Sequence, residues 1–156
     1  MSNGSSRVIL NGYTVLRPEM FKFWDKMNPA FLKFLDLVLQ GAGYNSDTVV
    51  ITSDWRDPQA QASQVGTHGG ASHSLHELGC AVDLRMPRRS VNGKPDYAKL
   101  GLVDEAVCLY RRGTQTEVEI DITPDDMHIH IGQWIGLKGP LFLEVTCRHL
   151  QPVSDA

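Results

Sequence analysis

Two alternating segments in the last third of the chain constrain the fold more than any other feature of the sequence. Residues 117–123 and residues 127–134 both alternate apolar and polar side chains. A period of two predicts strands that bury one face. The turn residues Thr123-Pro124-Asp125-Asp126 stand between them. We therefore expect a β-hairpin.

Earlier segments have helical patterns. Residues 18–27 predict a short helix, and residues 96–112 predict a longer one closed by Gly113. Asn28 and Pro29 are typical of a helix N-cap followed by a proline at the first helical position. The helix that follows should end at Gly41 or Gly43 and bury one apolar face, formed by Phe31, Phe34, Leu35, Val38 and Leu39.

Three further segments favour strands: 48–53, 80–84 and, at an edge, 140–146. Helices early and in the middle of the chain, with mostly antiparallel strands late, predict the α+β class. We expect a small antiparallel sheet flanked by helices. Residues 7–152 should form a single domain between flexible ends at 1–6 and 153–156.

Composition excludes several classes of partner. The 156 residues carry 15 Lys and Arg against 18 Asp and Glu, a net charge of −3. This balance predicts neither a nucleic-acid partner nor an anionic membrane partner. No run reaches the roughly 18 apolar residues of a membrane span. We expect a monomer.

The start of the chain and its cysteines predict the compartment. The first seven residues are polar and lack the apolar core of a signal peptide. The three cysteines include no C-x-x-C pair, and an odd, sparse set predicts no disulfide framework. We therefore expect synthesis in the cytoplasm without a signal peptide.

Five of the six histidines fall into two groups, at 68–76 and 128–130. His76 and Asp83 are seven residues apart with Gly79 between them, so a loop feeding a strand could bring both to one ion. A catalytic zinc needs three such ligands and an open position for water. His128 and His130 share one face of a predicted strand, so either could supply the third ligand.

Two charged residues suit the chemistry of such a site. Asp125 could reach past a ligand at His128 to take a proton from water. Arg56, just after the strand predicted at 48–53, could stabilise an oxyanion. The structural alternatives are that Asp125 is a turn residue, that Arg56 pairs with Asp54 or Asp57, and that Ser74 caps a turn.

At these residues the chain resembles the zinc D-Ala-D-Ala carboxypeptidases and their relatives. The relatives include L-alanyl-D-glutamate endopeptidases of phage endolysins, vancomycin-resistance dipeptidases and the hedgehog-type zinc domain. Their pattern S-x-H-x-x-G-x-A-x-D is matched at every fixed position, by Ser74, His76, Gly79, Ala81 and Asp83. The segment T-S-D-W-R at 52–56 resembles their T-S-G-Y-R, and Asp125-x-x-His128 resembles their acid-x-x-His.

The resemblance implies the fold of this family and a Zn2+ ion held by His76, Asp83 and His128. It also implies Asp125 as general base, with Arg56 and Ser74 as oxyanion or substrate contacts. His130 is then a second contact to substrate or water. Some relatives carry H-x-H with the second histidine on the metal, which would make His130 the ligand. Met127 would then occupy the position of the base, so we favour His128.

The expected activity is hydrolysis of a peptide bond in the stem peptide of peptidoglycan, as in endolysin-like endopeptidases. The alternatives are a carboxypeptidase or dipeptidase acting on D-Ala-D-Ala or a related D-amino-acid peptide, and a zinc-stabilised binding module without activity. By analogy with endolysins, an enzyme that cuts the wall would leave the cytoplasm through a separate export pore.

Overall fold

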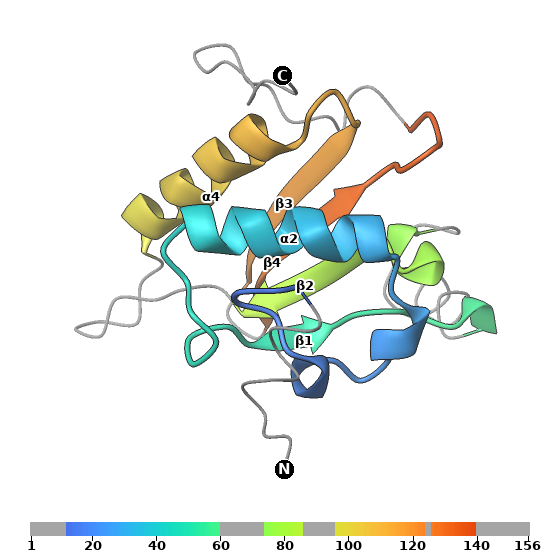
Figure 1. Cartoon of the computed structure of the whole chain (residues 1–156). Helices are drawn as coiled ribbons and strands as arrows, with labels where there is room; N and C mark the ends of the chain where they lie inside the picture. The colour runs from blue at the N-terminus through green and yellow to red at the C-terminus, as the bar shows by residue number, and fades with distance from the viewer. Residues whose placement is uncertain (1–11, 60–73, 86–95, 124–125, 140–156) are drawn as a thin grey trace.

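Four antiparallel strands form one sheet in the order β1-β2-β4-β3 (Figure 1). A computed structural model describes residues 12–59, 74–85, 96–123 and 126–139. The strands are β1 (Ile51–Ser53), β2 (Ala81–Arg85), β3 (Thr116–Thr123) and β4 (Asp126–Gln133). The helices are α2 (Pro29–Gly41) and α4 (Tyr97–Tyr110), with the 3-10 helices η1 (Pro18–Met20), η2 (Trp24–Lys26) and η3 (Leu75–Leu78). These elements confirm the α+β class.

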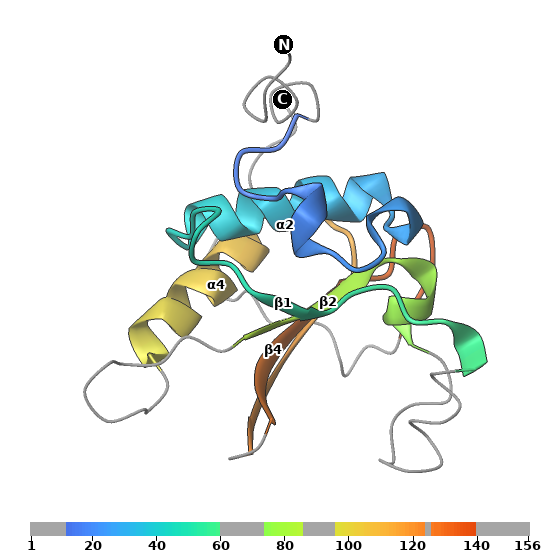
Figure 2. The ribbon, with the colours of Figure 1, turned by 90° about the horizontal axis from the view of Figure 1, so that it is seen from below.

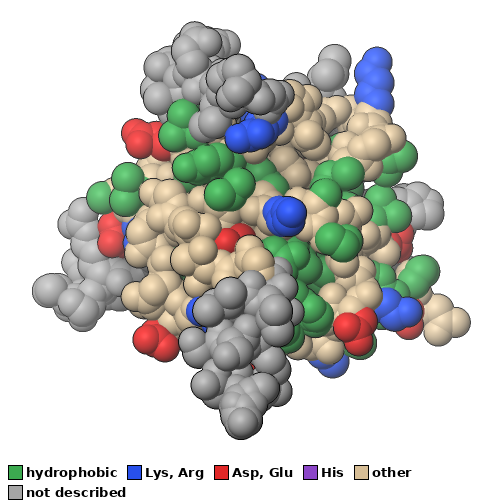
Figure 3. Space-filling model, in the orientation of Figure 1, with side chains coloured by type: hydrophobic (Ala, Val, Ile, Leu, Met, Phe, Trp, Pro, Cys, Tyr) green, Lys and Arg blue, Asp and Glu red, His purple; other side chains and the backbone are tan. Residues whose placement is uncertain are grey.

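The two faces of the sheet differ in character. Val82 on β2 pairs with Ile131 on β4, and Leu84 pairs with Ile129; all four side chains are buried in the core. Helices α2 and α4 both lie on this apolar side (Figure 2). Because side chains alternate along a strand, the residues between these apolar positions face away from the helices. On the helical side, Figure 3 shows apolar side chains and no histidine among the described residues.

Helix α2 forms as its sequence predicts. Pro29 is at its first turn, and the side chain of Asn28 accepts hydrogen bonds from the backbone N–H groups of Ala30 and Phe31. The predicted apolar face is buried at all five positions, Phe31, Phe34, Leu35, Val38 and Leu39.

The same helix carries a buried acid that ties down the preceding chain. The carboxylate of Asp36 accepts the backbone N–H groups of Thr14, Val15 and Leu16 at 2.8–3.0 Å. It also accepts a hydrogen bond from Nε2 of Gln40 at 2.9 Å. These bonds satisfy a charge that would be costly to bury alone.

Two segments differ from expectation for identifiable reasons. Residues 18–27 form η1 and η2 instead of one helix, because the N–H of Phe23 donates to the carboxylate of Asp54 at 2.7 Å. Strand β1 begins at Ile51 instead of residue 48, because Thr48 belongs to a turn in which its N–H donates to the carbonyl of Asn45.

The remaining predicted segments agree with the structure or lie outside it. Strand β2 is shifted by one residue from 80–84, and α4 ends at Tyr110 because Arg112 has a left-handed φ of 48°. Strands β3 and β4 pair along their whole length, as a hairpin would. Residues 124–125 of the turn, the strand expected at 140–146 and both predicted flexible ends lie outside the described residues.

Two further findings concern the cysteines and membrane-spanning segments. Cys80 is a free, buried thiol, whereas Cys108 is disulfide-bonded, contrary to our expectation from the odd cysteine count. Sequence spacing does not report the distance between two sulfur atoms, which decides pairing. Within the described residues, no helix has both the length and the apolar character needed to cross a membrane.

Candidate metal centre

Three potential metal ligands meet on the polar face of the sheet. Asp83 on β2 is the direct partner of His130 on β4, and His76 lies on η3, just before β2. Oδ1 of Asp83 is 3.1 Å from Nδ1 of His130 and 3.4 Å from Nε2 of His76. One ligand atom from each residue lies within 4.8 Å of the other two. These three residues therefore form a possible metal-binding triad.

Both ends of η3 are held, which fixes the position of His76. Ser74 is the N-cap, and its Oγ accepts the backbone N–H of His76 at 3.2 Å. Gly79 ends the helix with a left-handed φ of 69°, and its carbonyl accepts the N–H of Asn28 at 3.0 Å. A Cβ at position 79 would clash with the carbonyl oxygen of Lys26. The local structure of η3 thus explains why the motif has a serine before His76 and a glycine after it.

Each histidine of the triad has a second partner on its other ring nitrogen. Nδ1 of His76 is 2.7 Å from the carbonyl oxygen of Asp54. A carbonyl only accepts hydrogen bonds, so Nδ1 carries a proton, and Nε2, on the side of Asp83, is the nitrogen that could bind a cation. Nε2 of His130 is 2.7 Å from Oε1 of Glu117. Such outer partners orient metal-binding histidines in known sites.

The pKa values of Asp83 and His130 are shifted by their neighbours at this site. Burial raises the pKa of Asp83, but hydrogen bonds from His130 and His76 outweigh burial and hold that pKa well below its usual range. Burial lowers the pKa of His130, but hydrogen bonds to Asp83 and Glu117 raise it to about 9. The imidazole of His130 thus lies between two carboxylates that favour its protonated form, and a cation bound at Nδ1 would have to displace that proton.

The third member of this group differs from the one we expected. His128 pairs with Arg85 across the β2–β4 ladder, two residues along from the pair of Asp83 with His130. Its Nε2 still lies 3.9 Å from Oδ1 of Asp83. The triad contains His130, and His128 lies beside it, half-buried on the same face.

The other predicted site residues fall in different places. Arg56 lies beside the triad, with Nη2 4.0 Å from Oδ2 of Asp83 and 3.2 Å from Oγ of Ser53, to which it donates. Its backbone N–H also donates to the carbonyl of His76 at 3.0 Å. Ser74 acts as a helix cap, the structural alternative noted for it. Asp125 lies outside the described residues.

Sequence reasoning missed Glu117 and the carbonyl of Asp54. Glu117 is 6% exposed, and its Oε2 accepts Nε1–H of Trp134 at 3.3 Å. A signal was present, because the alternation in residues 117–123 places Glu117 on the polar face, and a hairpin would set it beside the histidines. A backbone carbonyl carries no such signal, because every residue has one.

The chemistry of the donor set fits a divalent cation. Two imidazole nitrogens and a carboxylate oxygen match catalytic zinc sites with three protein ligands, and they also suit other first-row metals. Because the far nitrogen of each ring is hydrogen-bonded, both rings are oriented for the ion. Arg56 lies close enough to assist a developing negative charge there.

No protein-family model, curated protein or solved structure matches the chain.

Proposed function

We propose that the protein is a zinc-dependent peptidase that hydrolyses a peptide bond of the peptidoglycan stem peptide. The observation that carries the proposal is the triad of His76, Asp83 and His130, with Nδ1 of His76 held by the Asp54 carbonyl and a carboxylate behind His130. Three such ligands leave an open coordination position, as catalytic zinc sites require. The match to S-x-H-x-x-G-x-A-x-D supports the same proposal.

We further propose His130 as the third ligand in place of His128. The β2–β4 register supports this choice, because it sets His130 directly opposite Asp83. His128, whose Nε2 lies 3.9 Å from Oδ1 of Asp83, would then be a contact to substrate or water. The fold would be that of the hedgehog-type and DD-peptidase zinc domains, which the order of the motifs along the chain supports.

Different residues of the chain would have different roles in hydrolysis. When bound, zinc polarises a carbonyl and lowers the pKa of a water molecule toward about 7. Arg56 lies near Asp83 and is placed to stabilise the oxyanion. With His130 as the ligand, Met127 stands at the acid position of the acid-x-x-His pattern and cannot take a proton. We propose that Asp125, two residues earlier, takes the proton from the attacking water and returns it to the leaving amine.

Digestion of purified muropeptides, followed by mass spectrometry of the released ends, tests the activity. New L-Ala carboxyl termini are the result expected of an endopeptidase, and free D-Ala is the result expected of the alternative carboxypeptidase. Absence of any product while zinc is bound would contradict the proposal and favour a binding module.

The role of Asp125 has a matched control in its neighbour. We expect Asp125→Asn to keep bound zinc and to lose hydrolysis by roughly 100-fold or more, the usual contribution of a general base. Asp126→Asn should keep both. Equal loss in the two variants would show that the turn, and not the base, matters.

A further inference from the structure

The segment that follows β1 holds the short helix η3 through three consecutive residues. The carbonyl oxygen of Asp54 lies 2.7 Å from Nδ1 of His76. The indole N–H of Trp55 donates to the carbonyl of Glu77 at 3.0 Å. The backbone N–H of Arg56 donates to the carbonyl of His76 at 3.0 Å. Residues 54–56 therefore contact both the ring and the backbone of His76.

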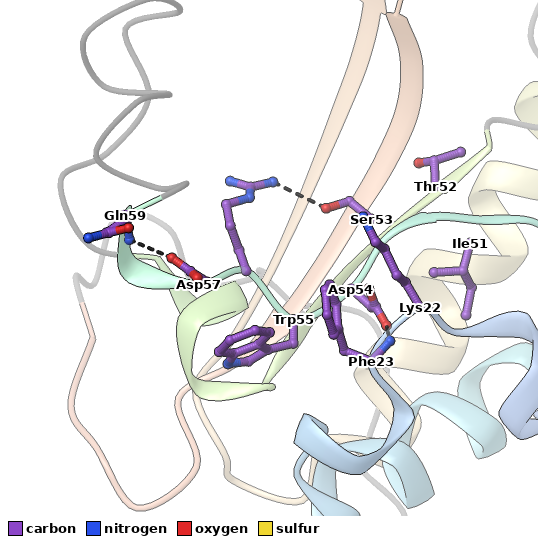
Figure 4. A pocket seen from close by; sticks show the side chains of 10 residues that line it. Lys22, Phe23, Ile51, Thr52, Ser53, Asp54, Trp55, Asp57 and Gln59 are labelled. Atoms are coloured by element: carbon purple, nitrogen blue, oxygen red, sulfur yellow. Dashed lines mark hydrogen bonds between the residues drawn. The ribbon is translucent and has the colours of Figure 1, made fainter.

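The side chain of Asp54 joins this segment to an earlier part of the chain. Asp54 is 4% exposed, and its carboxylate accepts the backbone N–H of Phe23 at 2.7 Å (Figure 4). Phe23 is the residue before η2 and lies 31 positions before Asp54 in the sequence. A hydrogen bond to a charged acceptor is roughly twice as strong as one between neutral groups. Asp54 thus holds the start of η2 with its side chain and the ring of His76 with its carbonyl.

Aromatic packing supports the same connection. The rings of Phe23 and Trp55 contact each other edge to face, with centroids 5.1 Å apart (Figure 4). Asp54 and Trp55 stand where the resembled pattern T-S-G-Y-R has glycine and tyrosine. A glycine could offer the carbonyl to His76 but has no carboxylate. The bond to the backbone of Phe23 therefore depends on the aspartate of this chain.

The carbonyl that meets His76 belongs to the peptide plane between Asp54 and Trp55. Side-chain contacts at both residues restrict the rotation of this plane. The direction of the carbonyl matters because His76 is only 2% exposed, and a buried Nδ1–H without an acceptor is costly. The same bond fixes the imidazole with Nε2 at 3.4 Å from Oδ1 of Asp83. A rotated plane would therefore move the nitrogen that could bind a cation.

We propose that Asp54 is a positioning residue for the metal site, whose carboxylate holds the peptide plane that orients the imidazole of His76. The part of this inference that names a metal site rests on the proposed function. Asp54 is not a ligand and acts on the site through its own carbonyl. Without the carboxylate, the carbonyl would remain in the chain but could turn away from Nδ1.

The zinc affinity of the full chain, measured by competition with a chromophoric chelator, is the first test. We expect Asp54→Ala to bind zinc about tenfold more weakly, as when a ligand loses its outer partner. Asp54→Asn should bind nearly as tightly as the wild type, because its amide oxygen can accept the N–H of Phe23. Asp54→Ser, whose side chain is one atom shorter, gives the same test as Asp54→Ala if the alanine variant does not fold.

Exchange of the Nδ1 proton of His76 with water separates positioning from a general loss of stability. NMR of the metal-free chain labelled with 15N-histidine measures this exchange. We expect slow exchange in the wild type and in Asp54→Asn. In Asp54→Ala the exchange should be about tenfold faster, the effect of losing one hydrogen bond of ordinary strength.

Asp96→Ala is the matched control. The carboxylate of Asp96 accepts the N–H of Lys99 at 3.1 Å at the start of α4, so this variant loses a bond of the same kind in a helix on the other side of the sheet (Figure 2). It should lower stability to urea and change neither the zinc affinity nor the exchange of the His76 proton. Unchanged zinc affinity or proton exchange in Asp54→Ala, equal losses in Asp54→Asn, or an equal loss of affinity in Asp96→Ala would each overturn the inference.

The inference and the proposed function can fail separately. A wild type that binds no zinc or cuts no muropeptide would overturn the proposed function, and the proton exchange would still report whether Asp54 orients the ring of His76. Conversely, hydrolysis of muropeptides together with unchanged zinc affinity in Asp54→Ala would overturn only the role of Asp54.

Discussion

Glu117 lies outside the triad and contacts His130 directly. Its carboxylate is 2.7 Å from Nε2 of His130 and is held in turn by the indole of Trp134. A charged acceptor at this position makes the imidazole a better ligand and fixes the ring orientation. The same interaction contributes to the raised pKa of His130. A cation that binds Nδ1 must therefore displace a proton that the ring holds tightly.

We therefore predict that Glu117→Gln weakens zinc binding by about 10- to 100-fold, the usual effect of losing such a partner. Competition with a chromophoric chelator measures the affinity. Glu119→Gln is the control, because Glu119 is on the same strand but exposed. An unchanged affinity in Glu117→Gln would show that the carboxylate does not act on the ligand.

Cys80 gives a prediction about pH. Burial raises the pKa of its thiol to about 11 from an ordinary value of 9.0. Since the folded state holds the proton more tightly than the unfolded chain, this group stabilises the fold below pH 9 and loses that contribution as the pH rises toward 11. Iodoacetamide at pH 8 should label Cys80 far more slowly in the native protein than in guanidinium chloride, as peptide mass spectrometry would show. Equal labelling rates would contradict the burial of this thiol.

At the scale of elements, the site depends on how η3 joins the start of α2. Gly79 is the contact point, with its carbonyl bonded to Asn28 and no room for a Cβ beside Lys26. Any displacement here would move His76, which is three residues earlier. Gly79 therefore positions His76 through its backbone conformation and its lack of a Cβ.

We predict that Gly79→Ala lowers the free energy of unfolding by about 1–2 kcal/mol for the left-handed backbone and by about 1–3 kcal/mol more for the clash. Gly113→Ala is a matched control, because Gly113 also has a positive φ, 78°, but has no atoms near its would-be Cβ. Only the first contribution should appear in the control. Urea denaturation of both variants measures the difference, and equal losses would contradict the close approach of Gly79 to the Lys26 carbonyl.

The elements that could be predicted from sequence are those specified locally. Asn28 and Pro29 define the start of α2 by themselves, and alternation defines β3 and β4. The length of β1 could not be predicted in this way, because Thr48 is taken by a turn and the strand pairs only opposite Asp83 and Leu84.

The candidate site, like the fold, could be predicted only where the sequence specifies it locally. His76 and Asp83 follow from spacing around Gly79, whereas H-x-H leaves two histidines on one face. The choice between His128 and His130 depends on strand register, a long-range property set by how β2 meets β4. The sequence left both histidines open as ligands, and the structure places His130 in the possible metal-binding triad.

At the scale of the whole molecule, the two faces of the sheet have different roles. One face buries the core against α2 and α4, and the opposite face carries the triad. Its ligands come from η3, β2 and β4, so a bound ion would connect elements that are distant in sequence. Metal binding should therefore stabilise the folded chain by mass action and raise its melting temperature.

Metal content is the most direct test of the central claim that His76, Asp83 and His130 hold zinc. The chain would be purified without a histidine tag, and its zinc would be measured by inductively coupled plasma mass spectrometry. We predict about one zinc per chain in the wild type. His128→Ala should retain it, and His130→Ala should lose it. A metal-free wild type, or loss in His128→Ala with retention in His130→Ala, would contradict the account.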